Sequence, residues 1–162
     1  MSESGQNEYD KIFFQYLKEE KVKDANKFRS EHPRYNPNLE KAPLVGKNFQ
    51  CLNLSAAKSK DTDEIDVEKE VNLVDSDLWG VDLTGADLTG ANCQGANFNH
   101  ANFVNANLTQ VNFDGASLRG ADFSGAKFDN TKLHGANLFD AKNLPLEIIE
   151  KHCADLKNSL QT

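Results

Sequence analysis

The sequence lacks the features that mark exported, membrane-spanning or disulfide-bonded proteins. Its 162 residues contain only three cysteines, Cys51, Cys93 and Cys153, which lie far apart and include no C-x-x-C pair. This spacing argues against a disulfide framework and against a zinc knuckle. No apolar run approaches the roughly 18 residues that a membrane-spanning helix needs, and the N-terminus has no basic-then-apolar signal pattern. We therefore expect a cytoplasmic protein with no membrane partner.

Basic charge is also scarce. The chain has 18 Lys and Arg residues against 25 Asp and Glu residues, which gives a formal net charge of −7. A nucleic-acid backbone requires a basic surface, so this balance argues against direct nucleic-acid binding. Hydrophobic residues make up 38% of the chain and charged residues 27%, a composition that allows one ordinary domain with little apolar material to spare.

What the sequence does contain is a repeat of five residues. Fourteen pentads follow one another without a gap from Val71 to Asp140. The first position is Ala in nine of them, and the fifth is Gly, Asn or Asp in twelve, residue types that tolerate a positive φ at a corner. The third position is always apolar, and we predict that these residues form the structural core: Leu73, Leu78, Leu83, Leu88, Cys93, Phe98, Phe103, Leu108, Phe113, Leu118, Phe123, Phe128, Leu133 and Leu138.

A period of five fits neither a helix, with its period of 3.6, nor a strand, with its period of two. A coil that turns one corner in every pentad buries the first and third positions, and four pentads then make one square turn of twenty residues. The tandem A-(D/N)-(L/F)-x-x pattern resembles the pentapeptide-repeat family, and this resemblance implies a right-handed quadrilateral β-helix. We expect an all-β solenoid of about 4.5 coils, counting eighteen pentads, with α-helical caps at its N- and C-terminal ends.

The same register can be recovered upstream as PNLEK APLVG KNFQC LNLSA, and the flanking sequences have helical apolar spacing. In the N-terminal part this spacing is interrupted at Glu19–Lys21. We predict the following segments: a helical N-terminal cap over 1–36, a first coil over 37–56, an acidic excursion loop over 57–70, the repeat β-helix over 71–143 and a C-terminal helix over 144–162.

The segment 57–70 has six acidic and three basic side chains and interrupts the register. Its large apolar residues, Ile65 and Val67, alternate with Asp66 and Glu68, and these four residues are the candidate partner-binding site of the loop. Two interpretations remain open at this point. The loop either becomes ordered when it docks on a partner or is a spacer without function, since solenoids tolerate loops at their corners.

The C-terminal helix, which Pro145 opens, carries a single apolar stripe that must bury against something. If the stripe folds back over the last coil, the protein is a monomer. If the stripe pairs with its symmetry mate, the protein is a dimer. We expect the monomer, because the coil end at Leu133 and Leu138 also needs cover. The stripe consists of Leu146, Ile149, Cys153, Leu156 and Leu160.

No constellation for catalysis emerges from the repeat. Residues that share a slot on adjacent coils differ by twenty in number, and no two acidic residues of the repeat differ by twenty. The predicted cross-coil pairs are Asp114 with His134 and Asp122 with Lys142, which we expect to be solvated surface pairs. The four histidines fall on both caps and on two different faces, and motifs for phosphate or dinucleotide binding are absent. We expect no catalytic residue, no metal site and no cofactor.

A rigid acidic rod is suited to presenting a surface, so we predict a non-enzymatic protein–protein interaction module whose partner is another protein. The family resemblance implies an alternative, because its quinolone-resistance members are dimeric rods that mimic B-DNA and bind DNA gyrase or topoisomerase IV. A DNA mimic needs continuous stripes of negative charge. The repeat acids fall two to each face, which is no stripe and favours the interaction module.

Overall fold

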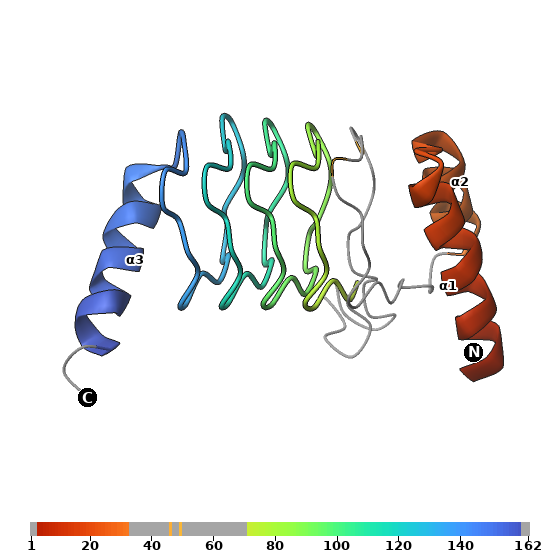
Figure 1. Ribbon diagram of the computed structural model, residues 1–162, viewed down its shortest axis with the longest axis horizontal. Helices are drawn as coiled ribbons and strands as arrows, with labels where there is room; N and C mark the ends of the chain where they lie inside the picture. The colour runs from red at the N-terminus through yellow and green to blue at the C-terminus, as the bar shows by residue number, and fades with distance from the viewer. Residues whose placement is uncertain (1–2, 33–45, 47–48, 50–70, 160–162) are drawn as a thin grey trace.

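The structure is a computed structural model that describes residues 3–32, 46, 49 and 71–159 (Figure 1). The coil of residues 71–143 lies between two helices at one end and a third helix at the other. The described helices are α1 (Glu3–Lys18), α2 (Val22–Glu31) and α3 (Leu146–Ser159). Among the described residues, no helix is long and apolar enough to cross a membrane.

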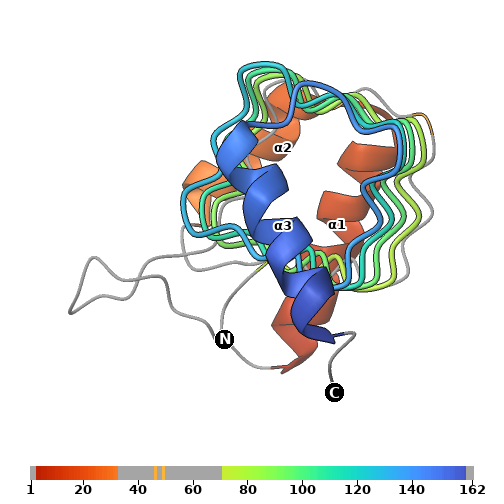
Figure 2. The ribbon, with the colours of Figure 1, turned by 90° about the vertical axis from the view of Figure 1, so that its left-hand side faces the viewer.

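Residues 71–143 form a coil that closes on itself every twenty residues. Parallel bridges join residues twenty apart, from Asn72↔Asn92 to Asp122↔Lys142. Each bridge stands alone, because the chain turns a corner within every pentad and no strand can extend further. Figure 2 shows the coils superposed along the axis in a four-sided outline. We number these coils as first (71–90), second (91–110), third (111–130) and fourth (131–143).

One hydrogen-bond rule holds the coils together. The N–H of the third position donates to a carbonyl 19 residues later, as Leu73 does to Asn92 at 2.7 Å, and so does the N–H of the fifth position, as in Gly80 to Asn99 at 2.8 Å. The N–H of the second position donates 21 residues back, as Asn92 does to Val71 at 2.9 Å. Backbone polar groups at the coil faces are therefore satisfied between coils, although the coils contain no extended strand.

Two described residues upstream also bond to the first coil. Gly46 N donates to Trp79 O and Phe49 N donates to Asp82 O, each at 2.7 Å, and Phe49 is buried. Both separations are 33 residues, 14 more than within the repeat, and 14 is the length of the segment 57–70. That segment, with the candidate residues Ile65, Asp66, Val67 and Glu68, lies outside the described residues, as does most of the predicted coil 37–56.

The second position is Asn or Asp for a local reason. Its side-chain oxygen accepts the backbone N–H of the fourth position, as Asn72 Oδ1 does from Val74 and Asp82 Oδ1 from Thr84, both at 3.0 Å. This Asx turn shapes the corner that follows. The polar half of the repeat motif is thus a turn signal and carries no chemistry of its own.

In the pentads whose second position is Ser117 or Lys132, a side chain from the preceding coil supplies the missing acceptor. Asn99 Oδ1 accepts the N–H of Arg119 at 3.0 Å, and Asp114 Oδ1 accepts the N–H of His134 at 2.9 Å. The predicted pairing of Asp114 with His134 across one coil is confirmed. The contact is to the backbone N–H of His134, so it stabilises the turn at that corner.

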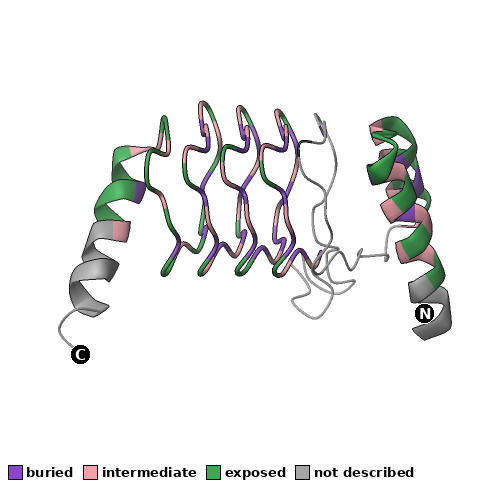
Figure 3. Ribbon diagram, viewed as in Figure 1, coloured by how far each residue is buried: buried purple, intermediate pink, exposed green. Residues whose placement is uncertain are grey.

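The core is a column of apolar side chains from the first and third positions. Figure 3 colours the buried residues along the coils purple. The structure places every predicted core residue from Leu73 to Phe128 in the buried interior, and it leaves Leu133 and Leu138 of the fourth coil half-buried. Phe103 and Phe123, twenty residues apart, stack with ring centroids 5.2 Å apart and planes 2° from parallel. The period of twenty therefore aligns rings as well as backbone.

At the N-terminal side, α1 and α2 form a helical hairpin with an aromatic interior. Phe13 and Phe28 are buried, with ring centroids 6.4 Å apart. The interruption predicted at Glu19–Lys21 is confirmed, since α1 ends at Lys18 and α2 begins at Val22.

At the other end, α3 begins after Pro145 as predicted, but the two stripe residues whose side chains the structure describes, Leu146 and Ile149, do not pack on the coil. Ile148 is 8% exposed, whereas Leu146 is 70% and Ile149 is 42% exposed, so the expectation that these two residues bury is wrong. The connection through Leu144 and Pro145 is short, and it sets the rotation of α3 so that Ile148 faces the coil. The side chains of Cys153, Leu156 and Leu160 lie outside the described residues.

The core column predicts the effect of removing one ring. Phe113→Ala deletes a fully buried side chain and leaves a cavity, so we expect a loss of about 3–5 kcal/mol in the free energy of unfolding. The matched control Phe139→Ala removes the same atoms from a side chain that is 61% exposed, and it should lose about 1 kcal/mol or less. Urea unfolding measures both. Equal losses would contradict the assignment of Phe113 to the core.

Candidate interaction surface

The described residues contain no cluster suited to metal binding: no three His, Cys, Asp or Glu side chains among them come together. The sequence predicts that no two acidic residues occupy equivalent positions on adjacent coils, and the bridged second positions of the first and second coils agree with this. Asp77, Asp82 and Asp87 of the first coil each pair with an asparagine of the second coil. Cys93 is buried in its central slot, so its thiol has no access to solvent.

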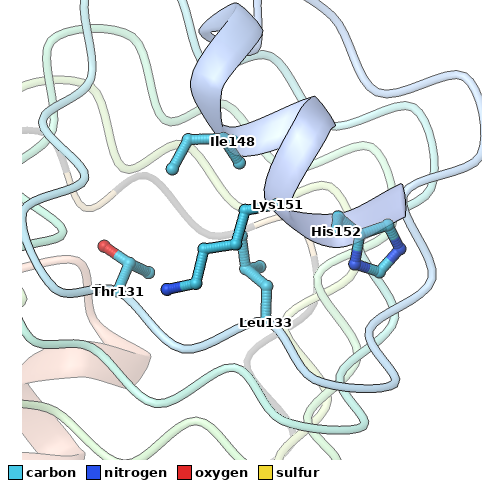
Figure 4. Close-up of a pocket in the computed structure, with 5 residues that line it drawn as sticks. All are labelled: Thr131, Leu133, Ile148, Lys151 and His152. Carbon is cyan, nitrogen blue, oxygen red and sulfur yellow. The ribbon is translucent and has the colours of Figure 1, made fainter. Parts of the chain in front are cut away.

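A small pocket lies beneath α3 (Figure 4). Its volume is about 10 Å³, roughly the space of one water molecule. Thr131 Oγ1 donates to the Leu108 carbonyl at 2.8 Å, and the buried Nδ1 of His152 has no hydrogen-bond partner among the described residues. A substrate cannot enter this space, so we assign it to the packing of α3 on the fourth coil. The lining residues are Thr131, Leu133, Ile148, Lys151 and His152.

The surface feature that stands out is one column of fourth positions. It consists of Trp79, Asn99, Arg119 and Phe139, one residue from each coil, and we call it the Trp79 column. Trp79 is 47% exposed and Phe139 is 61% exposed, and among the described residues of the β-helix these are the large apolar side chains that face solvent. Two exposed rings on one column of a polar surface mark a place where another molecule can bind.

Ring contacts order both ends of the Trp79 column. Trp79 packs edge-on against His100, with ring centroids 5.6 Å apart, and the Arg119 guanidinium lies over the Phe139 ring at 5.1 Å. In the middle, Asn99 Oδ1 accepts hydrogen bonds from Arg119 N and from Ser117 Oγ, the latter at 2.6 Å. The side chains of the column are therefore held in place before any partner arrives, which lowers the entropic cost of binding.

His100 owes its position to a glycine on the next coil. It occupies a corner at φ 58°, a conformation that side chains seldom adopt, and its ring leans over Gly120. A Cβ on Gly120 would lie 2.7 Å from His100 Nδ1. The glycine thus leaves room for the imidazole that supports Trp79.

The sequence contained the signal for this surface, because Trp79 and Phe139 differ by sixty, a multiple of twenty. A comparison of the numbers of the acidic residues alone does not detect the two rings. The loop residues proposed in their place fall outside the described part of the chain.

A second ordered group lies around Asp122 on the neighbouring face. Asn143 Nδ2 donates to Asp122 Oδ1 at 2.9 Å, and Ser124 donates to the same oxygen through its N–H at 3.0 Å and its hydroxyl at 2.8 Å. These hydrogen bonds lower the pKa of Asp122, and the bond from Asn143 has the largest effect. The positive charge of Lys142 also lowers this pKa. Asp122 and Lys142 lie one coil apart as predicted, but the principal partner of the carboxylate is Asn143.

Comparison with known families gives the repeat its identity. A family model described as pentapeptide repeats matches residues 69–105 and 101–140 in eight copies. Residues 69–140 of the chain belong to the pentapeptide-repeat family. The four-sided coil is accordingly the right-handed quadrilateral β-helix that the family resemblance implied.

Several solved pentapeptide-repeat structures are similar to this chain. Rfr23 from the cyanobacterium Cyanothece 51142 is 25% identical, with 69% of this chain and 92% of that chain covered and a TM-score of 0.39. HetL, involved in heterocyst differentiation regulation in Nostoc sp. strain PCC 7120, is 27% identical, with 67% and 54% covered and a TM-score of 0.25.

The plasmid-mediated fluoroquinolone resistance protein QnrB1 is 17% identical to this pentapeptide-repeat protein, with 69% and 73% covered and a TM-score of 0.28. No curated protein sequence matches the chain.

Two glycines allow a test of the support beneath Trp79. Gly115 and Gly120 both have positive φ, but a Cβ at Gly115 meets nothing within 4 Å. Gly115→Ala should therefore cost only the backbone strain, about 1 kcal/mol. Gly120→Ala must also displace the His100 ring and should cost roughly 1 kcal/mol more. Urea unfolding followed by Trp79 fluorescence measures both, and equal losses would contradict the position of His100.

The hydrogen bonds of Asp122 predict an acid-dependent stability. Because the folded pKa lies below the unfolded one, this contribution is present above the unfolded pKa, about 3.9, and is lost as the pH falls through the folded pKa. Asp122→Asn keeps an acceptor but does not titrate. The difference in unfolding free energy between the parent and this variant should be constant near neutral pH and shrink below about pH 4. A difference that does not change with pH would contradict the assignment.

Proposed function

We propose that this pentapeptide-repeat protein is a non-enzymatic protein–protein interaction module that binds its partner through the Trp79 column. The observation that carries the proposal is the exposure of Trp79 and Phe139 on one straight column of the β-helix. Aromatic and arginine side chains dominate the binding energy of protein interfaces, and Arg119 lies between the two rings in the column. Family membership supports the proposal, because pentapeptide-repeat proteins are in general structural or interaction modules.

The alternative is a DNA mimic that binds DNA gyrase or topoisomerase IV, as the likeness to a fluoroquinolone resistance protein suggests. The charge distribution along the rod argues against the DNA-mimic alternative. The second coil carries no Asp, Glu, Lys or Arg, so any negative stripe along the rod is interrupted there. In the third and fourth coils, Arg119, Lys127, Lys132 and Lys142 offset the acids. A surface that imitates two phosphate backbones requires continuous negative charge.

Capture from cells of the source organism tests the proposal. The immobilised parent should retain a defined protein that the double variant Trp79→Ala/Phe139→Ala loses. Leu146→Ala is the matched control, because it removes an exposed apolar side chain from α3 and leaves the column intact. Equal capture by the parent and the double variant would show that the partner does not bind through the Trp79 column.

A supercoiling assay with purified gyrase separates the two functions. The interaction module should leave supercoiling unchanged at any protein concentration. Inhibition of gyrase, or protection from a quinolone, would establish the DNA-mimic alternative instead.

A further inference from the structure

The fourth coil ends in an open backbone edge. Among the described residues, the N–H groups of Leu138, Asp140 and Asn143 have no acceptor, and the carbonyls of Ala136 and Ala141 have no donor. The equivalent groups of the three earlier coils all bond to the coil that follows. An unpaired edge of this kind is a template on which another extended chain can pair.

The helix α3 covers only the start of the fourth coil. Thr131 and Leu133 lie beneath it, where they line the small pocket. In Figure 2, α3 crosses the end of the rod diagonally, and the rest of the coil runs along two sides of the outline beside the helix. In that part of the coil Asn137 is exposed and Leu138 is half-buried. We call these residues, 136–143, the terminal edge.

We propose that the terminal edge binds an extended segment of another protein, which adds one further parallel layer to the rod. The hydrogen-bond rule of the coils fixes how such a segment pairs. Carbonyls at its second and fourth positions accept the N–H groups of Leu138 and Asp140, and its second N–H donates to Ala136 O, as in the earlier coils. The terminal edge is separate from the Trp79 column, so binding at either surface can fail without the other.

Asn137 favours an acidic residue at the second position of the segment. Its Oδ1 accepts the backbone N–H of Phe139 at 3.1 Å, and its Nδ2 has no acceptor among the described residues. In the same column, Asn97 Nδ2 donates to Asp77 Oδ1 at 2.9 Å. The amide of Asn137 can donate in the same way to a carboxylate of the added layer.

Lys142 favours a second acidic residue five positions later. Bridged second positions are direct neighbours, and Lys142 stands beside Asp122 on the coil below and lowers the pKa of that carboxylate. Lys142 is exposed and is the outermost described residue of its column. A carboxylate of the added layer would lie on its other side, where the attraction supports one register of the segment over others.

Asp140 requires a glycine between these two acids. It occupies a left-handed corner at φ 57°, as Asp75 does at φ 53°. The Asp75 carboxylate lies across Gly95 of the next coil, and a Cβ at that glycine would collide with it. His100 and Asn105 lie across glycines of the next coil in the same way. A segment paired on the terminal edge therefore needs glycine at its fifth position, beside Asp140.

Together these neighbours specify the segment as small–Asp–apolar–any–Gly–small–Asp. Residues 81–87 of this chain have this pattern, but they are already bonded to the second coil, as Leu83 N is to Asn102 O at 2.8 Å. Within the described part of the chain, a second copy thus offers no free segment of this kind, which favours a different protein as the partner. The same residues supply a probe, a capped and fluorescently labelled peptide VDLTGADLTG that copies 81–90.

Titration of the protein with this peptide tests the terminal edge. Fluorescence anisotropy should give a Kd between about 10 µM and about 1 mM, as expected for a small interface. In nuclear magnetic resonance spectra, the amide signals of Leu138, Asp140 and Asn143 should shift. Trp79→Ala should bind the peptide like the parent, because the Trp79 column is a different surface.

A glycine exchange makes the test specific for the register. A peptide with Ala in place of its first Gly should bind the parent about thirtyfold more weakly, because Ala is strained at a left-handed corner and its Cβ collides with Asp140. Asp140→Gly removes the carboxylate and keeps a residue suited to the corner. Against this variant the difference between the two peptides should fall to about fivefold, the effect of the strain alone.

A charge exchange tests the second acid. A peptide with Lys in place of its second Asp should bind the parent about threefold more weakly, and Lys142→Gln should remove this difference.

Four results would overturn the proposal. The first is no binding of the peptide at about 1 mM, which would leave Lys142 as a charge that protects the edge from pairing. The second is equal binding of the Gly and Ala peptides by the parent. The third is loss of binding in Trp79→Ala, which would assign the peptide to the Trp79 column. The fourth is a parent that dimerises and that the peptide dissociates, which would make a second copy the occupant.

Discussion

The backbone ladder between residues twenty apart is the constraint on which the rest of this structure depends. It holds the coils in register, as in the bridge between Asn72 and Asn92, although no strand within residues 71–143 is longer than a single bridge. The register stacks Phe103 on Phe123 in the core and forms the columns on the surface. A slip of one pentad would move every inward residue to a neighbouring face and dismantle the Trp79 column.

A functional surface arises from this register without any concave site. Within the described residues, the small pocket beneath α3 holds no more than a water molecule, and Asp77, Asp82 and Asp87 of the first coil stand beside asparagines. What the rod offers is a straight, rigid line of side chains at fixed spacing. Rigidity of this kind favours recognition, because little conformational freedom remains to be lost on binding.

The sequence was sufficient for the coil of residues 71–143 because the pattern there is strictly periodic and every pentad obeys the same steric rule. It also indicated where α3 begins, since Pro145 marks the start of the helix. It could not indicate which face of α3 packs on the fourth coil, because Leu146, Ile148 and Ile149 are all apolar and the short connection after the coil decides the rotation. Likewise, the contact of Arg119 with Phe139 depends on side-chain conformation, which a repeat pattern does not predict.

The ordered Trp79 column is the central claim, and nuclear Overhauser contacts between its side chains test it most directly. In dilute, monomeric protein, the Trp79 indole protons should show cross-peaks to the His100 ring, and the Arg119 side-chain protons should show cross-peaks to the Phe139 ring, matching the centroid distances of 5.6 Å and 5.1 Å. Absence of both sets of cross-peaks in a folded sample, or contacts of Trp79 with residues of other columns, would contradict the register and the surface that depends on it.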